Sequence, residues 1–135
     1  MENKKFVKYS NIRINYKLWM TSESGDAIID DDKWQMLISI QQLGSLKAAA
    51  DKEKISYRKA WGDIRKMESI LGFSLVEKHR GGRSGGVTIL TNEGAKLIGA
   101  YVLFHAEFQQ NVDDTIRKFK RRSSSHNNDE DFHRH

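Results

Sequence analysis

Residues that begin or end helices recur at short intervals between positions 30 and 72, and this spacing constrains the fold more than any other feature. Three aspartates at residues 30–32 precede a helical pattern that ends at Gly44. Ser45 precedes a second, alanine-rich pattern, and Ser56 precedes a third that ends at Gly72. Asp and Ser side chains accept hydrogen bonds from the first free amides of a helix, and glycine closes the last turn. The chain therefore predicts three short helices joined by tight turns.

A β-hairpin pattern follows the third helix. Residues 73–80 and 87–91 read as two strands, and the sequence between them, residues 81–86, is Gly-Gly-Arg-Ser-Gly-Gly, which is typical of a flexible turn. A nucleotide-cradling loop would instead need Gly-Lys-Ser/Thr at the start of a helix, whereas a strand follows here. The order helix, helix, helix, hairpin is that of a winged helix-turn-helix, with the hairpin as its wing.

Two further elements flank this pattern. Residues 12–20 alternate apolar and polar side chains, which predicts a half-buried strand, and residues 27–29 are expected to return beside it as a short partner. From Asn92 to about Lys120, apolar residues recur every three or four positions, and no proline interrupts them. This predicts a helix of about 28 residues, roughly 42 Å long. We therefore expect a mainly α (α+β) fold with an N-terminal strand pair, a β-hairpin wing and a long C-terminal dimerisation helix.

The expected organisation has four parts. These are an N-terminal arm at 1–11, the winged helix-turn-helix at 12–91, the long helix at 92–122 and a disordered tail at 123–135. The tail is polar and carries three acidic residues, one Arg and three histidines. We interpret it as a solvated segment and not as a metal site, because nothing orders its histidines as ligands.

The net charge of +5 is unevenly distributed along the chain. The tail is net −2, and residues 44–86 hold ten Lys or Arg against five Asp or Glu. An excess of positive charge favours an anionic partner such as nucleic acid. The basic run at residues 117–122 has a simpler interpretation, since cations complement the negative end of a helix dipole.

The third helix, residues 57–71, is expected to be basic on one side. Helical spacing predicts a core-facing side composed of Tyr57, Ala60, Trp61, Ile64, either Met67 or Glu68, and Leu71. The opposite side then carries Arg58, Lys59, Gly62, Arg65 and Lys66. A basic helix suits the major groove of DNA, where cations meet phosphates and the first side chains reach base edges. A solvated helix of mixed charge is the alternative, although only Asp63 and Glu68 offset the four cations.

The expected DNA-binding residues combine this basic side with two helix caps and the wing tip. The amides beside the capping serines can hold phosphates, and arginines on a pliant tip fit phosphate or minor-groove contact. Tyr57 has two candidate roles, DNA contact or packing. The full set is Ser45, Ser56, Tyr57, Arg58, Lys59, Gly62, Arg65, Lys66, Arg80 and Arg83.

The long helix is longer than the small domain it follows, so its distal apolar seam needs a partner. A second copy of the chain is the simplest one, and folding back on residues 12–20 is the alternative for part of the seam. The expected dimer interface is Tyr101, His105, Phe108, Val112, Ile116 and Phe119. We expect His105 to be a packed histidine, because no second histidine lies at helical spacing from it.

Enzymatic chemistry is not expected. Cysteine is absent, which excludes disulfides, thiolate metal sites and a cysteine nucleophile. We find no nucleophile–base set, no paired carboxylates and no metal motif, and the aspartates at 30–32 are better explained as helix caps. No cofactor and no metal are predicted. The chain also lacks an apolar run of roughly 18 residues and a signal peptide, so we expect a cytoplasmic protein without a membrane partner.

Two segments resemble a known family of regulators. Residues 44–50, Gly-Ser-Leu-Lys-Ala-Ala-Ala, and residues 55–61, Ile-Ser-Tyr-Arg-Lys-Ala-Trp, are similar to the helix-turn-helix of the molybdate-dependent ModE family and, more loosely, of LysR-type regulators. The glycine-rich loop and the string Leu90-Thr91-x-x-Gly94 resemble the same family. The resemblance covers roughly residues 12–120. It implies a dimeric winged-helix protein that binds double-stranded DNA through a recognition helix at 56–71 and a wing at 80–86.

The resulting prediction is a sequence-specific, DNA-binding transcriptional regulator that acts as a homodimer. ModE-type regulators carry oxyanion-binding modules after the DNA-binding domain, and this chain of 135 residues is expected to lack its own. An effector or a sensor partner is therefore left open. The alternative is a winged-helix module that binds other proteins and not DNA, because fold alone does not determine function.

Overall fold

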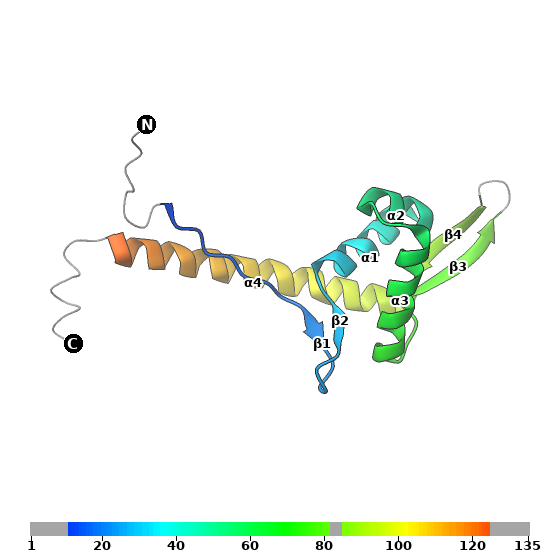
Figure 1. The fold of residues 1–135 in the computed structure, drawn as a ribbon, viewed down its shortest axis with the longest axis horizontal. Helices are drawn as coiled ribbons and strands as arrows, with labels where there is room; N and C mark the ends of the chain where they lie inside the picture. Colours follow the sequence, from blue (N-terminus) through cyan, green and yellow to red (C-terminus); the bar gives the residue numbers. More distant parts are fainter. Residues whose placement is uncertain (1–10, 82–84, 125–135) are drawn as a thin grey trace. The chain divides into compact units, whose positions relative to one another are not determined.

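The structure, a computed structural model, describes residues 11–81 and 85–124 (Figure 1). The chain divides into two compact units. The first, here called the main unit, is Lys17–Val102, and the described part of the second unit comprises residues 11–16 and 103–124. The predicted N-terminal arm lies outside the described residues apart from Asn11, and so does the predicted tail apart from its first two residues.

Three helices form at the predicted positions: α1 (Asp31–Leu43), α2 (Leu46–Glu53) and α3 (Tyr57–Leu71). Each begins with the predicted cap. Asp30 accepts a hydrogen bond from the amide of Lys33, Ser45 from that of Ala48, and Ser56 from that of Lys59, at 3.2, 3.0 and 3.0 Å. The three caps are therefore confirmed, and each satisfies an amide that the helix itself leaves unpaired.

The three helices end in the same backbone conformation, but with different residue types. Gly44 and Gly72 end α1 and α3 in the left-handed conformation, with φ of 67° and 84°. α2 ends at Lys54, which adopts the same conformation with φ of 62° although it carries a side chain. Its amide donates to the carbonyl of Asp51, and the amide of Ile55 donates to that of Ala50. These hydrogen bonds close the last turn of α2 without glycine.

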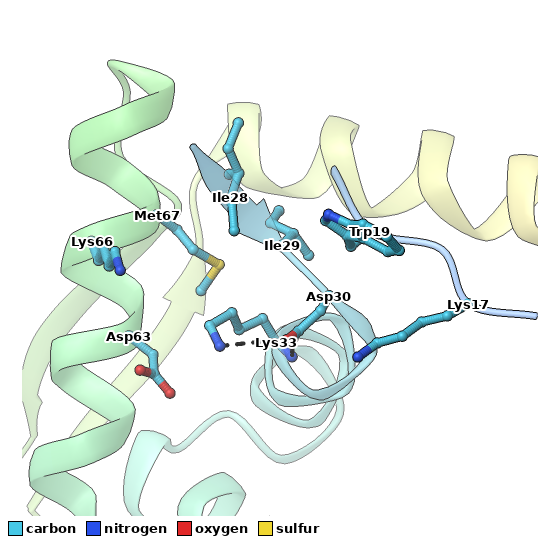
Figure 2. Close-up of a pocket in the computed structure, with 10 residues that line it drawn as sticks. Lys17, Trp19, Ile28, Ile29, Asp30, Lys33, Asp63, Lys66 and Met67 are labelled. Atoms are coloured by element: carbon cyan, nitrogen blue, oxygen red, sulfur yellow. Dashed lines mark hydrogen bonds and ion pairs between the residues drawn. The ribbon is translucent and has the colours of Figure 1, made fainter. Parts of the chain in front are cut away.

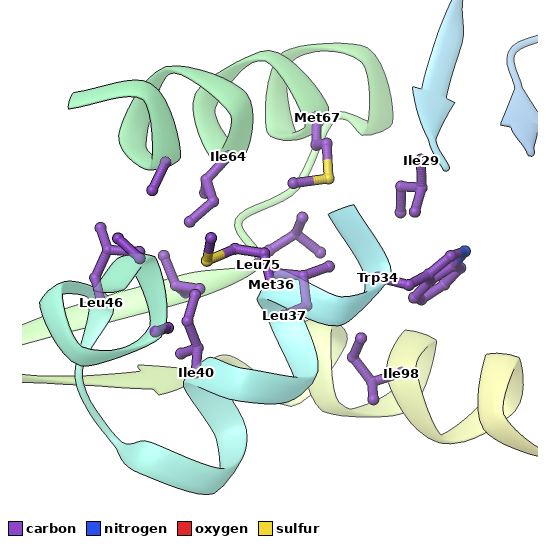
Figure 3. Packing of buried hydrophobic residues seen from close by; sticks show 14 of the residues in the cluster. Ile29, Trp34, Met36, Leu37, Ile40, Leu46, Ile64, Met67, Leu75 and Ile98 are labelled. Carbon is purple, nitrogen blue, oxygen red and sulfur yellow. The ribbon is translucent and has the colours of Figure 1, made fainter. Parts of the chain in front are cut away.

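The core of the main unit lies between the three helices, the hairpin and the start of the long helix (Figure 3). Side chains from different elements meet there: Trp34, Leu37 and Ile40 from α1, Leu46 from α2, Ile64 and Met67 from α3, with Leu75 and Ile98. Ala49, Ala50 and Ala60 are fully buried at the contact of α2 with α3. These small side chains allow the two helices to approach closely.

The hairpin wing consists of β3 (Val76–Gly81) and β4 (Gly85–Leu90), paired antiparallel with Val76 opposite Leu90. The strands extend into the glycines that were expected to form the loop. Residues 82–84, and with them Arg83, lie outside the described residues. A Cβ at Gly86 would lie 2.9 Å from the carbonyl oxygen of His79, so glycine allows close pairing here.

Thr88 attaches the wing to the helix-turn-helix. It is buried, its amide donates to the carbonyl of Gly44 at 2.9 Å, and its hydroxyl accepts from the amide of Leu46 at 3.2 Å. At the start of the other strand, the carboxylate of Glu68 accepts from the amides of Leu75 and Val76 at 2.7 and 3.3 Å. The wing is therefore held by hydrogen bonds at both strands, which fixes its position beside α3.

The predicted strand at residues 12–20 is largely wrong. The strand pair exists, but it comprises only β1 (Met20–Thr21) and β2 (Ala27–Ile29). Residues 12–19 form no strand, and Ile14 and Tyr16 are 40% and 42% exposed instead of half-buried. The physical reason is the partner: β2 has three residues and offers no further backbone groups for pairing, so an alternating pattern alone does not produce a strand.

The long helix is α4 (Asn92–Ser124), which extends slightly beyond its predicted end. The hydroxyl of Thr91 accepts from the amide of Gly94 at 2.9 Å and begins it. In the main unit, Tyr101 of this helix stacks on Trp34 with ring centroids 3.5 Å apart. In the second unit, Tyr16 packs against Phe108 edge to face at 5.6 Å. Residues before 17 therefore cover part of the seam, as the fold-back alternative predicted, but without forming a strand.

Within the described ranges, none of the helices is both long enough and apolar enough to span a bilayer.

Candidate nucleic-acid interface

α3 is amphipathic in the predicted sense. Ala60, Ile64 and Met67 are buried in the core. On the other side of the helix the five predicted residues are all exposed: Arg58, Lys59, Gly62, Arg65 and Lys66. We call these five residues the basic face. Their exposure is what a DNA contact requires, and their role remains a prediction.

Gly62 lies in the middle of this basic face. A Cβ built at Gly62 would meet nothing within 4 Å, so no contact inside the described protein requires a glycine. A glycine inside a helix is about 1 kcal/mol less favourable than alanine. The missing side chain leaves α3 open to close approach from outside, with cations one turn away on either side.

One cation of the basic face is already engaged. The ammonium of Lys59 lies 3.1 Å from the Asp63 carboxylate one turn along. Exposed pairs of this kind contribute about 0–1 kcal/mol, so a phosphate can replace the carboxylate at little cost. Lys59 is therefore available to an anionic partner, with Asp63 as its internal alternative.

The first turns of α3 contradict one expectation. Tyr57 and Trp61 were predicted to face the core; Trp61 is half-buried and packs against it, whereas Tyr57 is 39% exposed. Both contact Lys78 of β3, whose ammonium donates to the Tyr57 hydroxyl and lies 5.1 and 5.4 Å from the two ring centroids. The prediction failed for Tyr57 because helical spacing does not show where the wing lies, and the wing provides a partner for this ring.

Four residues thus form an aromatic–cation cluster: Tyr57, Trp61, Arg65 and Lys78. The Trp61 indole N–H donates to the Tyr57 hydroxyl at 3.0 Å, and the Arg65 guanidinium lies 5.1 Å from the Trp61 ring centroid. Cations are attracted to the faces of aromatic rings at this distance. The cluster joins α3 to the first strand of the wing.

Sequence reasoning missed Lys78. The strand register places it opposite the buried Thr88, and alternation places Val76, Lys78 and Arg80 on one face of the hairpin. Val76 is buried, whereas Lys78 and Arg80 are exposed. Period-two spacing from Val76 could have found Lys78, but only once the register of the hairpin was known.

The cluster shifts one ionisation. The hydrogen bond from Lys78 lowers the pKa of Tyr57 below its ordinary value, and the Trp61 hydrogen bond and the Lys78 charge act in the same direction, against a smaller increase from burial. A lowered pKa means that the phenolate forms at lower pH. We therefore expect Tyr57→Phe and Lys78→Met each to remove the earliest component of the tyrosinate absorbance titration. A titration unchanged by Lys78→Met would contradict the contact.

The two predicted caps, Ser45 and Ser56, precede α2 and α3. A hollow of about 420 Å³ opens between the start of α2 and the hairpin. Its lining includes Ser45, Lys47, Tyr57, Lys78 and Gly86. Ser56 is exposed at the start of α3. The structure therefore brings one cap, the start of α3 and the wing around one hollow.

A second hollow, of about 290 Å³, lies between β2, α1 and α3 (Figure 2). Ile29 and Met67 line it, and Lys33 beside it pairs with Asp30 at 3.7 Å. No group of three His, Asp or Glu side chains within the described residues could hold a metal ion. The acidic side chains at this hollow are thus better explained as partners of neighbouring lysines and as caps.

The sequence of this region is similar to that of known proteins. The family of bacterial regulatory helix-turn-helix proteins of the lysR type matches residues 32–95. Transcriptional regulator ModE of Haemophilus influenzae is 36% identical over 90 residues, which cover 66% of this chain and 35% of that protein. Molybdenum transport protein ModE of Azotobacter vinelandii is 31% identical over 97 residues, covering 72% and 36%. The chain carries a ModE-like winged-helix domain. It spans about a third of the length of these curated relatives.

Solved structures agree with the ModE-like fold. The CbnR DNA-binding domain in its DNA complex matches with a TM-score of 0.54 at 19% identity, covering 67% of this chain and 98% of that one. Full-length BenM, as its R156H mutant, matches with a TM-score of 0.52 at 25% identity, covering 66% and 28%. The winged helix-turn-helix predicted from the order of elements is therefore confirmed.

Proposed function

We propose that this protein is a transcriptional regulator that binds specific duplex DNA through α3 and the β3–β4 wing. The carrying observation is that Arg65 of the exposed basic face and Lys78 of the wing both lie over the Trp61 ring. Relatives over the same residues are named transcriptional regulators. Such a regulator acts where the DNA is, which in a bacterium is the cytoplasm.

In this proposal α3 enters the major groove. Arg58, in the first turn, reaches base edges, because the N-terminal residues of a recognition helix approach them most closely. Arg65, Lys66 and the wing cations then contact backbone phosphates, which position the helix but carry no sequence information directly. The amides at the starts of α2 and α3, beside Ser45 and Ser56, supply further phosphate contacts.

Selection of bound sequences from a random duplex pool tests the function. We expect one enriched motif, and a two-fold symmetric motif would show that two copies bind. Because the relatives' names refer to molybdenum, upstream regions of molybdenum-transport genes are the first natural duplexes to include. The absence of binding to any duplex at low salt would favour the alternative, a protein-interaction module.

Substituting Gly62 is expected to change stability and DNA affinity in opposite directions. Gly62→Ala is expected to increase the free energy of unfolding by about 1 kcal/mol, because alanine favours the helix and meets no neighbour. The same variant should bind the selected duplex more weakly if DNA approaches this face closely. Thermal unfolding and fluorescence anisotropy measure the two effects. A variant that is more stable and binds equally well would show that DNA does not approach α3 at Gly62.

We further propose that a second copy covers the apolar seam of α4. Phe108, one of the predicted interface residues, contacts Tyr16. Phe104, which was not in the predicted set, stacks on Phe108 with ring centroids 5.8 Å apart and is 52% exposed. Exposed aromatic rings on an amphipathic helix are typical of an interface. The proposed set comprises Tyr101, His105, Phe108, Val112, Ile116 and Phe119, with Phe104 added.

Sedimentation of charge-substituted variants tests this dimer. Phe104→Glu combined with Ile116→Glu is expected to yield monomers, because both substitutions place charge on the seam. Leu103→Glu is the matched control, since Leu103 is 69% exposed but lies about half a turn away from the seam. If Leu103→Glu dissociates the dimer and the double variant does not, the interface lies on the other face of α4.

A further inference from the structure

Trp61 holds two cations that come from different elements. The guanidinium of Arg65, one turn along α3, lies 5.1 Å from the indole centroid, and the ammonium of Lys78, on β3, lies 5.4 Å from it. The indole itself is half-buried, whereas both cations are exposed. The ring is thus a fixed surface on which two mobile side chains rest.

Tyr57 completes this arrangement from the first turn of α3. Its hydroxyl accepts from the Trp61 indole N–H at 3.0 Å and also from the Lys78 ammonium. One oxygen therefore ties the ring that carries the cations to one of the cations itself. These hydrogen bonds make Tyr57 a structural link between the Trp61 ring and Lys78. Of its two candidate roles, packing and DNA contact, they favour packing.

The other cations of the basic face are held differently. Lys59 pairs with Asp63. In the part of the chain that the structure describes, Arg58 and Lys66 have no ion pair and no ring contact. Of the described cations in α3 and β3, only Arg65 and Lys78 lie over a ring, and one comes from each element.

We propose that Tyr57 and Trp61 are positioning residues that hold Arg65 and Lys78 at a set spacing for two backbone phosphates of the bound duplex. This inference rests on the proposed DNA-binding function and identifies the group that makes α3 and the wing one rigid contact surface. Long cationic side chains lose rotamer freedom when they bind, and the ring removes part of that freedom in advance. The two rings therefore raise the affinity for DNA without themselves touching a base.

A double-mutant cycle, measured on the full chain with the selected duplex, tests whether the rings position the two cations. Lys78→Gln is expected to reduce the slope of log K against log salt by about 0.9, the value for one neutralised phosphate. Trp61→Leu is expected to weaken binding about tenfold while leaving that slope within experimental error, since the cations remain. In a background of Arg65→Gln with Lys78→Gln, Trp61→Leu should change affinity by less than about twofold, because the residues that it positions are gone.

Conservative variants separate positioning from folding. Trp61→Phe keeps an aromatic face and is expected to restore affinity to within about threefold of wild type. Lys66→Gln is the matched control: it lowers the salt slope without dependence on residue 61. Thermal unfolding of each variant shows whether it folds.

The outcomes are distinguishable. If wild type binds no duplex, the proposed function fails. The proposed function stands but the positioning role is wrong in two cases. In one, wild type binds but Lys78→Gln leaves the salt slope unchanged. In the other, Trp61→Leu weakens binding equally in wild type and in the Arg65→Gln, Lys78→Gln background.

Discussion

Arg58→Ala combined with Arg65→Ala is expected to weaken specific duplex binding about 100-fold, which corresponds to about 2.7 kcal/mol. A base-edge contact by Arg58 would contribute about 1–3 kcal/mol of discrimination, and a phosphate contact by Arg65 would add the remainder. Both side chains are exposed on the basic face of α3 and make no structural ion pair among the described residues. Their removal should therefore leave the fold intact.

The two arginines are expected to affect the salt dependence differently. Arg65→Ala should reduce the slope of log K against log salt by about 0.9, whereas Arg58→Ala should mainly relax base preference at one position. Anisotropy titrations at several salt concentrations measure both effects. Lys96→Ala is the charge-matched control, because Lys96 is exposed on α4 and belongs to neither α3 nor the wing. If all three variants weaken binding equally, only the net charge matters and α3 is not the recognition helix.

Gly94→Ala is expected to lower the free energy of unfolding by about 3 kcal/mol, at the upper end for an overpacked site. A Cβ at this position would lie 2.3 Å from the carbonyl oxygen of Leu75, which is backbone and accepts the Thr91 amide at 2.9 Å. The carbonyl cannot move without disturbing the junction of the wing with α4. Denaturant unfolding measures the loss.

Gly99→Ala is the matched control for this prediction. Gly99 lies in the same helix, and a Cβ there meets nothing within 4 Å. Because alanine favours the helical backbone, the free energy of unfolding of this variant is expected to rise by about 1 kcal/mol. If Gly94→Ala proves as stable as wild type, the close approach of α4 to Leu75 does not exist in solution.

Local chemistry was readable from the sequence. Caps act over three or four residues, so Ser45, Ser56, Gly44 and Gly72 predicted the helix boundaries in advance. The exposed basic face followed from helical spacing for the same reason. The strand at 12–20 failed because a strand needs a partner, and β2 ends after three residues.

The arrangement of α3 and the wing was not readable in this way. Tyr57 and Trp61 have the spacing of core residues, yet they meet Lys78, which is about 20 residues away in the chain. The register of the hairpin and its attachment through Thr88 decide that contact. The sequence by itself thus determined which segments are helices, where each one starts, and where α1 and α3 end, because capping and periodicity are short-range. Only the tertiary structure decided which cations share one surface, because that depends on how separate elements pack.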